Sequence, residues 1–326
     1  MVSRSAAVLG MCLAAVVAFR WSAEMAERRP VHKRVWMVQL SSDEYLPGVL
    51  TLDFSMKKVA SKYALVVMHP RDALSDATMA ALRRRGIATK AITMLRAAKT
   101  YTGFDARFNH AWTKLLPHGM TEYDRVVELD ADMVALQNAD ELMEMRLEPA
   151  TMAATHACVC NPKQLAHYPA DFRPENCAYT AQHARPATAH LPEHAVPGRF
   201  GLALPNGGLQ VIDPDAGTFR RLLAVLANAT LVASFSHAEQ NALRLVFAGR
   251  WVALPWVYNG LYTMREAHQP IWNDSLVKIV HYIIEKPWDD ALQEHSHLET
   301  YRWWWRLQKE RLRFEQNMAR VSDEVR

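Results

Sequence analysis

Two acidic residues, Asp130 and Asp132, directly follow the apolar run at residues 125–129. One small residue, Ala131, separates them, so in an extended turn both carboxylates can face the same site. A hard divalent cation prefers such oxygen ligands, and a diphosphate on the same cation would complete its coordination shell. Asp-x-Asp recurs by chance in loops, so its position after an apolar strand is what favours a metal and diphosphate site.

The elements that must position this pair follow from the pattern of the first 130 residues, where four apolar runs alternate with three amphipathic segments. The apolar runs are residues 35–40, 64–68, 87–92 and 125–129, and the amphipathic segments are residues 45–59, 75–85 and 107–116. Strands that alternate with helices predict a doubly wound, mostly parallel α/β sheet. Such sheets bind ligands beyond the carboxyl ends of their strands, so candidate residues should lie just after Leu40 and Leu129.

The second half of the chain is less regular. The segment at residues 156–200 contains six prolines and five histidines, and its length predicts a functional or cysteine-tethered loop. Regular patterns then predict two strands, two helices and one long C-terminal helix. These are the strands at residues 208–212 and 278–283, the helices at residues 214–226 and 239–247, and the helix from Leu292 onward.

Three of the four cysteines, Cys158, Cys160 and Cys177, lie close together in the sequence, and Cys12 lies in an N-terminal apolar run. One disulfide and one free thiol are possible in an oxidising compartment, with the pairing left open. A metal site is weakly indicated, because a structural zinc ion takes four ligands and only three cysteines are present here.

The composition excludes some partners. Half of the 326 residues are apolar, 22% are charged and the net charge is +4. This composition supports a sizeable core, and the interleaving of basic with acidic residues predicts no nucleic-acid partner.

The N-terminus predicts a membrane contact. Residues 5–19 carry no charge and lie between Arg4 and Arg20, which favours an uncleaved signal-anchor over a cleaved signal peptide. Residues 1–33 would form this anchor and a stem. The chain would then be a single-pass type II protein of the Golgi or endoplasmic reticulum with its remainder in the lumen, or alternatively a secreted protein. The sequons at Asn228 and Asn273 would be usable there.

The run from Lys114 to Asn138 resembles the central motif of glycosyltransferase family 8, which includes glycogenin and galactinol synthase. Further blocks resemble the family in the same order, between about Trp36 and Trp288. They are Leu40 to Gly48, Asn206-Gly207-Gly208, Glu239-Gln240, Leu254-Pro255 with Tyr258-Asn259, and His281 followed by Lys286-Pro287-Trp288.

The resemblance implies a GT-A-like fold, that is, a doubly wound, mostly parallel sheet with a C-terminal helical extension. The glycosyltransferase domain would cover residues 34–290 and the helix residues 291–326. The implied activity is a manganese-dependent, retaining transfer of a hexose or uronic acid from a UDP-sugar to a hydroxyl acceptor, which could be a glycan, a lipid or a polyol. The alternative is a catalytically inactive relative that acts as a binding or scaffold protein.

The resemblance also implies roles for individual residues. Asp130, Asp132 and His281 would bind Mn²⁺, and Lys286 would act on the diphosphate leaving group. Glu239 and Gln240, beside the transferred sugar, would be catalytic residues together with Lys286. Residues implied to bind the nucleotide-sugar are Leu40, Ser42 and Tyr45 at the uridine, Arg107, Lys114 and Ala131 near the diphosphate, and Asn206 and Gly207 around the sugar.

The chain departs from the family pattern in several places, two of which concern the implied site residues. Glu239 stands where the family has Asp, which lengthens the carboxylate that would contact the sugar by one methylene. The usual glycine between His281 and Lys286 is absent, and that spacing is one residue short. In the C-terminal helix, Trp303, Trp304 and Trp305 are interpreted as packing residues rather than a sugar platform.

Overall fold

The computed structural model describes residues 33–100, 108–184, 193–194, 204–289 and 298–324. The chain divides into two units, residues 1–33 and 34–326. All elements below belong to the second unit.

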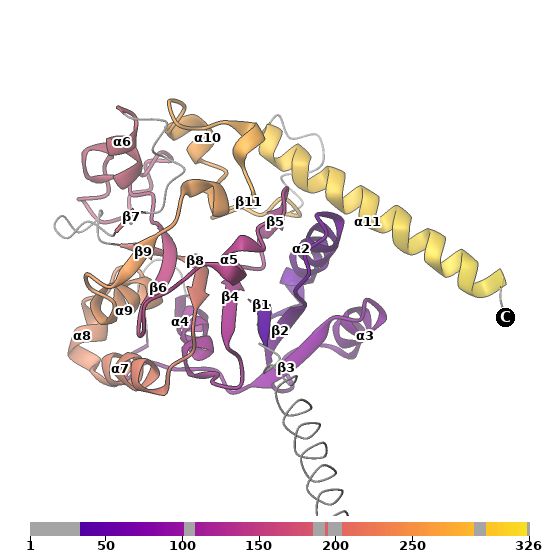
Figure 1. Ribbon diagram of the computed structural model, residues 1–326, viewed down its shortest axis with the longest axis horizontal. Helices are drawn as coiled ribbons and strands as arrows, with labels where there is room; N and C mark the ends of the chain where they lie inside the picture. Colours follow the sequence, from indigo (N-terminus) through magenta and orange to yellow (C-terminus); the bar gives the residue numbers. More distant parts are fainter. Residues whose placement is uncertain (1–32, 101–107, 185–192, 195–203, 290–297, 325–326) are drawn as a thin grey trace, which may run out of the picture. The chain divides into compact units, whose positions relative to one another are not determined.

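The centre of this unit is an eight-stranded mixed sheet (Figure 1). In spatial order its strands are β3 (Ala88–Ile92), β2 (Leu65–Pro70), β1 (Arg34–Gln39), β4 (Arg125–Leu129), β8 (Pro205–Ile212), β6 (Met152–His156), β9 (Trp251–Ala253) and β7 (Glu193–His194). Strands β3, β2, β1 and β4 are mutually parallel, and β8 is antiparallel to both β4 and β6. The prediction of a doubly wound, mostly parallel α/β sheet is therefore confirmed.

The direction of winding reverses at β1. The chain moves outward from β1 to β2 and β3 on one side, and β4 then pairs with β1 on the other side. Val38 pairs with Leu129, so β1 and β4 end at the same level. Their carboxyl ends flank the crevice in which doubly wound sheets bind ligands.

A second, three-stranded sheet starts directly after the acidic pair. It contains β10 (Gly260–Leu261), β11 (Ile279–His281) and β5 (Met133–Ala135), in that order. The antiparallel register of β11 and β5 pairs His281 with Met133, and the Tyr282 amide donates to the Asp132 carbonyl at 2.9 Å. This register places His281 beside Asp132 although 148 positions separate them in the sequence.

Helices flank the sheet and connect its strands. The α-helices are α2 (Leu46–Lys58), α3 (Asp76–Arg84), α4 (Phe108–Ala111), α5 (Glu141–Glu144), α6 (Ala178–Gln182), α7 (Ala216–Ala227), α8 (Ala229–Ala233), α9 (Ala238–Val246), α10 (Met264–Ala267) and α11 (Glu299–Glu324). The 3₁₀ segments are η1 (Asp43–Tyr45), η2 (Trp112–Gly119), η3 (Pro174–Asn176), η5 (Trp256–Tyr258) and η6 (Asp274–Leu276).

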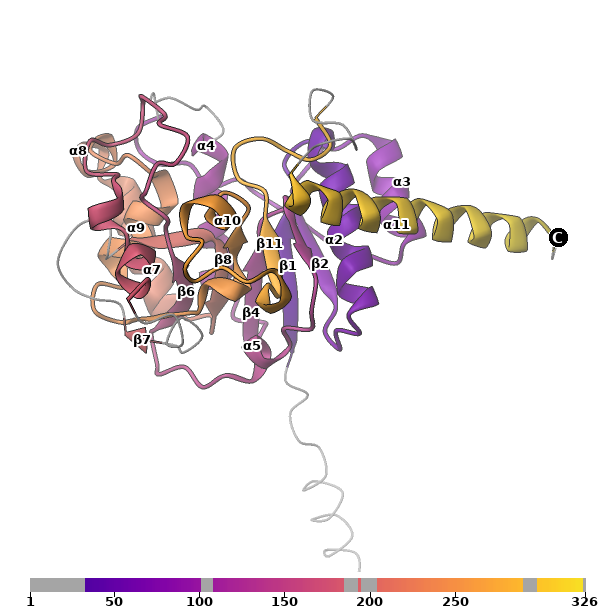
Figure 2. The same ribbon diagram turned by 90° about the horizontal axis from the view of Figure 1, so that it is seen from above.

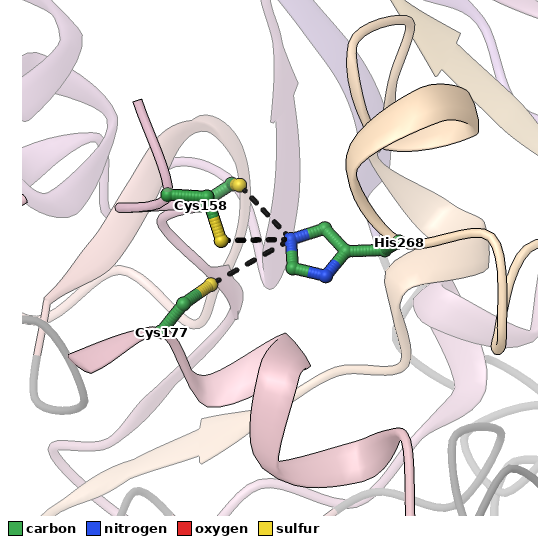
Figure 3. A group of neighbouring side chains, drawn as sticks. Cys158, Cys177 and His268 are labelled. Atoms are coloured by element: carbon green, nitrogen blue, oxygen red, sulfur yellow. Dashed lines mark hydrogen bonds between the residues drawn. The ribbon is translucent and has the colours of Figure 1, made fainter. Parts of the chain in front are cut away.

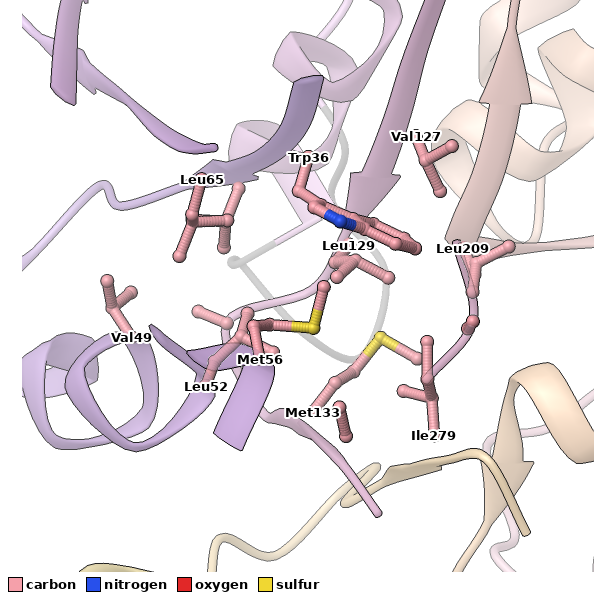
Figure 4. Packing of buried hydrophobic residues seen from close by; sticks show 14 of the residues in the cluster. Trp36, Val49, Leu52, Met56, Leu65, Val127, Leu129, Met133, Leu209 and Ile279 are labelled. Carbon is pink, nitrogen blue, oxygen red and sulfur yellow. The ribbon is translucent and has the colours of Figure 1, made fainter. Parts of the chain in front are cut away.

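The main core lies between α2 and one face of the central strands (Figure 4). Side chains alternate along β1: Trp36 and Val38 belong to this core, whereas Met37 packs in a separate cluster. Strands buried on both faces are typical of parallel sheets covered by helices on both sides.

Some predicted elements differ from the structure. The helix predicted at residues 107–116 is a short α4 followed by η2, which contains Pro117 and therefore lacks one amide donor. Strands β6 and β9 were not predicted. In β6 the sequence Met-Ala-Ala-Thr-His has little of the β-branched character that marks a strand.

The C-terminal helix α11 packs along α2, as both views show (Figures 1 and 2). Trp304 is 1% exposed, and its ring centroid lies 5.5 Å from that of Trp288. Trp303 and Trp305 pack against the same apolar cluster. The interpretation of these tryptophans as packing residues is confirmed.

The prediction of a single-pass type II membrane protein is corrected. Among the helices that the structure describes, none is both long enough and apolar enough to cross a membrane. The apolar segment at residues 5–19, on which that prediction depended, lies outside the described residues.

The expectation of a disulfide is also corrected. Cys158, Cys160 and Cys177 are all free thiols.

Candidate functional site

A cavity of about 730 Å³ lies at the carboxyl ends of β1 and β4. Its volume is in the range of small-molecule sites. Most residues that the resemblance implicated line it. They are Ser42, Tyr45, Lys114, Asp130, Ala131, Asp132, Asn206, Glu239, Gln240, His281 and Lys286.

The donor set Asp130, Asp132 and His281 forms one corner of this cavity. The Nε2 atom of His281 lies 3.2 Å from Asp132 Oδ1 and 3.5 Å from Asp130 Oδ2, and one ligand atom of each residue lies within 4.8 Å of the others. Asp130 and Asp132 stand in the turn from β4 to β5, and His281 ends β11. Two carboxylates and an imidazole are chemically suited to Mn²⁺.

The orientation of His281 also supports a metal site at the donor set. Both amide hydrogens of Asn259 are used, since Nδ2 contacts Thr155 Oγ1 at 3.0 Å and Asn206 Oδ1 at 2.9 Å. The Asn259 Oδ1 atom therefore accepts from His281 Nδ1 at 2.9 Å. With the proton on Nδ1, the neutral ring turns the lone pair of Nε2 toward the two carboxylates, an arrangement that a shared cation would stabilise.

A lysine contacts each carboxylate. Lys114 Nζ lies 2.6 Å from Asp130 Oδ1, and Lys286 Nζ donates to Asp132 Oδ2 and, at 2.9 Å, to the Tyr282 carbonyl. Burial alone would raise the pKa of Asp132, but the Lys286 charge and the contact with His281 outweigh it and hold the pKa well below its usual range. The two ammonium charges thus balance the two carboxylates.

Glu239 and Gln240 stand in the first turn of α9, on the side of the cavity next to β8. The side chain of Glu239 is buried, its Oε1 lies 4.0 Å from Lys114 Nζ, and its Oε2 has no hydrogen-bond partner among the described residues. Burial raises the pKa of Glu239 to about 7, although Lys114 opposes the shift. Gln240 Oε1 accepts from the Gly207 amide at 2.9 Å.

Two glycines allow close approach at the donor set. A Cβ atom on Gly208 would lie 2.4 Å from His281 Cε1, and one on Gly48 would lie 2.2 Å from the Ala131 carbonyl. Gly207 and Gly208 belong to strand β8 rather than to a turn, so they are required for space and not for a left-handed backbone.

The predicted uridine residues are only partly at the cavity. Ser42 and Tyr45 line it, and the Tyr45 ring lies 5.8 Å from that of Trp288 and 5.9 Å from Lys286 Nζ. The Leu40 side chain is fully buried in the main core instead. Arg107 lies outside the described residues.

The turn from His281 to Lys286 shows how the missing glycine is accommodated. Ile284 has a φ angle of 69°, in the left-handed region that a β-branched residue rarely adopts. Ile284 also lines the cavity. The turn at this strained position reverses the chain, so that Lys286 reaches Asp132.

Sequence reasoning missed several residues around the site. A buried row across β4 and β8 contains Glu128 and Gln210, with His118 of η2 beside them. Gln210 donates to Glu128 at 3.0 Å, and its Oε1 lies 3.1 Å from His118 Nε2. Burial raises the pKa of Glu128 well above its ordinary value. The available signal was a single polar residue between apolar neighbours in each strand, Glu128 in β4 and Gln210 in β8.

Part of the long proline-rich segment also lines the cavity. The side chains concerned are Leu165, His167, Tyr168 and Phe172. The prediction of a functional or cysteine-tethered loop named this segment but none of these side chains.

Known proteins resemble the chain over most of its length. The model of glycosyl transferase family 8 matches residues 38–291. Galactinol synthase 2 of Arabidopsis thaliana is 27% identical over 84% of this chain and 83% of its own. The uncharacterized protein R707 of Acanthamoeba polyphaga mimivirus is 22% identical, over 80% of this chain and 88% of its own.

Solved structures show the same fold. The galactosyltransferase LgtC, in complex with donor and acceptor sugar analogs, matches 84% of this chain and 95% of its own at a TM-score of 0.57 and 16% identity. The bifunctional glycosyltransferase WbbM matches 86% of this chain at a TM-score of 0.60 and 17% identity, and the match spans half of the WbbM chain. The protein thus belongs to glycosyltransferase family 8 and is a glycosyltransferase with the GT-A fold.

Proposed function

We propose that this glycosyltransferase moves a hexose or uronic acid from a UDP-sugar to a hydroxyl acceptor, with retention of anomeric configuration and with Mn²⁺. The observation that carries the proposal is the convergence of Asp130, Asp132 and His281 on one corner of the cavity, with Lys114 and Lys286 beside them. The names of the relatives, galactinol synthase and galactosyltransferase, make galactose the first donor sugar to test.

Asp130, Asp132 and His281 would hold the manganese ion. When bound, the ion neutralises the diphosphate and favours its departure. Because Lys114 and Lys286 already balance the two carboxylates, a cation alone gains little at this site. We therefore expect manganese and the UDP-sugar to bind together, with both lysines turning from carboxylate to phosphate.

The remaining residues would bind and orient the sugar. Glu239 and Gln240 lie at the start of α9, and Asn206 is held by the Asn259 amide. A carboxyl group with a pKa near 7 can donate or accept a hydrogen bond at a sugar hydroxyl. In a retaining reaction the acceptor enters on the face from which the diphosphate leaves, so a phosphate oxygen would take its proton.

The test is hydrolysis of a panel of UDP-sugars by residues 34–326, with and without manganese. We expect hydrolysis of at least one UDP-hexose or UDP-uronic acid that requires manganese and is lost in Asp132→Asn. Manganese binding, measured by calorimetry, should tighten at least tenfold when UDP is present.

Ser236→Ala is the matched control, because Ser236 contacts His237 outside the donor set. It should leave hydrolysis and manganese binding unchanged. UDP binding with no turnover of any sugar would instead favour the alternative of an inactive, ligand-binding relative. Unchanged turnover by Asp132→Asn at limiting manganese would contradict the assignment of the metal site.

A further inference from the structure

A second group of potential metal ligands lies beside the cavity, apart from the donor set. The thiols of Cys158, Cys160 and Cys177 all lie near the Nε2 atom of His268. Their Sγ atoms lie 3.2, 3.4 and 3.7 Å from His268 Nε2, respectively. Figure 3 shows the side chains of Cys158 and Cys177 directed toward this ring. His268 supplies the fourth ligand that the cysteine spacing alone lacks.

These distances match the edges of a zinc tetrahedron. With Zn–S bonds of about 2.3 Å and Zn–N bonds of about 2.0 Å, tetrahedral geometry separates sulfur from nitrogen by about 3.5 Å and two sulfurs by about 3.8 Å. The four ligand atoms all lie within 4.8 Å of one another. Small shifts of the side chains would therefore complete the tetrahedron, without any change of backbone.

The imidazole of His268 is also oriented as a ligand. Its Nδ1 atom lies 2.9 Å from His183 Nε2, and the Tyr179 ring packs edge-on at 5.5 Å. A proton on Nδ1 would be donated to His183, which leaves the lone pair of Nε2 directed at the sulfurs. Metal-binding histidines typically use their second nitrogen in this way.

The cluster joins three separate segments of the chain. Cys158 and Cys160 follow the end of β6, Cys177 precedes α6, and His268 follows α10. His268 is fully buried, and Cys177 is 2% exposed. With four protein ligands the tetrahedron has no open position, which is the mark of a structural rather than a catalytic zinc site.

We propose that Cys158, Cys160, Cys177 and His268 bind one structural zinc ion. The ion fixes both ends of the segment at residues 161–176, which carries Leu165, His167, Tyr168 and Phe172 to the cavity. The zinc site does not depend on the proposed function, since it concerns none of the residues assigned to the UDP-sugar.

The first test is metal analysis of the wild-type protein. Residues 34–326 are produced in zinc-supplemented medium and purified without an immobilised-metal column or a chelator. We expect one zinc ion per chain that survives dialysis, and X-ray absorption should show three sulfur ligands and one nitrogen ligand at the bond lengths given above. This measurement uses no variant, so misfolding cannot obscure it.

The second test compares variants. Cys177→Ala and His268→Gln should lose the zinc ion, whereas Asp132→Asn should retain it although this variant loses the manganese-dependent hydrolysis. His118→Gln is the matched control, because His118 is also buried but contacts Gln210 rather than a thiol. It should retain one zinc ion per chain.

Four results would overturn the proposal, three of them measured on the wild-type protein. These three are wild-type protein that binds no zinc, a zinc ion with only nitrogen and oxygen ligands, and a disulfide among the three cysteines in non-reducing mass spectrometry. Zinc content at the wild-type level in both Cys177→Ala and His268→Gln would do the same. If the protein bound zinc but had no transferase activity, the proposed function would be contradicted and the zinc proposal would stand.

Discussion

At the scale of single residues, Lys286 has the position of a group that acts on the leaving diphosphate. Its ammonium contacts the Asp132 carboxylate and the Tyr282 carbonyl, so it is held at the donor set by two acceptors. Negative charge builds on the distal phosphate as the nucleotide leaves, and a fixed cation stabilises that charge most in the transition state.

We therefore expect Lys286→Ala to lower kcat on the order of 10²-fold, with a smaller effect on the donor KM. Lys286→Arg should recover only part of the loss, because a guanidinium is wider than an ammonium group. Steady-state kinetics with the donor varied would measure both. A rise in KM alone would make Lys286 a uniform binder and contradict this role.

Ile284 stores backbone strain in the same turn. Its φ of 69° costs a β-branched residue about 1–2 kcal/mol, and Ile283 next to it is also half-buried but has no positive φ. Ile284→Gly should therefore cost less stability than Ile283→Gly, by about 1–2 kcal/mol, because only the first change relieves strain. Urea denaturation of the two variants measures the difference. Equal losses would mean that the turn is not strained.

At the scale of elements, the buried row behind the site links pH to stability. Burial lowers the pKa of His118 to about 4, against about 6.5 in an unfolded chain. Between these values only the unfolded chain binds the proton, so the free energy of unfolding decreases as the pH falls from 6.5 to 4. The loss is about 3 kcal/mol for a shift of this size.

We expect His118→Asn to remove this part of the pH dependence. Burial raises the pKa of Glu239 and Glu128, so these groups contribute a slope of opposite sign in both proteins. The prediction therefore concerns the difference: in denaturation between pH 7 and 4 the wild type should lose about 3 kcal/mol more stability than the variant, whatever their stabilities at pH 7. Burial also lowers the pKa of His237 to about 4, so His237 leaves a slope of the same sign in both proteins. Identical profiles would show that the pKa of His118 is the same in the folded and the unfolded chain.

The elements also show what could be predicted from the sequence. Strand β4 and the pair Asp130 and Asp132 are adjacent in sequence, so the apolar run and the motif together predicted both. His281 was predicted only through the family resemblance, because its place depends on the pairing of β11 with β5.

Long-range contacts account for what was missed. Asn259 orients His281, and His268 joins the cysteines. Asn259 was part of a block that resembles the family but was given no role, and His268 was not named. Both lie in irregular chain, and their partners are roughly 20 to 110 residues away. Periodicity predicts which face of an element is buried, but it gives no information on which distant side chain a loop residue meets.

At the scale of the whole molecule, the C-terminal helix is connected to the site through aromatic rings. Trp304 of α11 packs on Trp288, and Trp288 packs edge-on against Tyr45 at the cavity. The helix therefore supports both the turn that holds Lys286 and the predicted uridine side of the cavity.

Trp304→Ala should lower the free energy of unfolding by about 3–5 kcal/mol, the usual cost of truncating a buried tryptophan. It should also weaken donor binding, because Trp288 loses its support. Trp305→Ala is the control, since Trp305 is only half-buried in the same helix, and it should cost less on both counts. Urea denaturation measures stability, and UDP titration measures donor binding. An unchanged donor affinity in Trp304→Ala would show that α11 does not support the site.

The segment between Cys160 and Cys177 begins and ends at one point of the molecule, the cysteine and histidine cluster. A segment with both ends fixed can change in length and composition without moving the strands beneath it. Residues 161–176 can thus be regarded as a segment that can be replaced as a unit. Replacing residues 161–176 by a segment of different length and composition should therefore change the side chains that line the cavity and leave the strands beneath the segment in place.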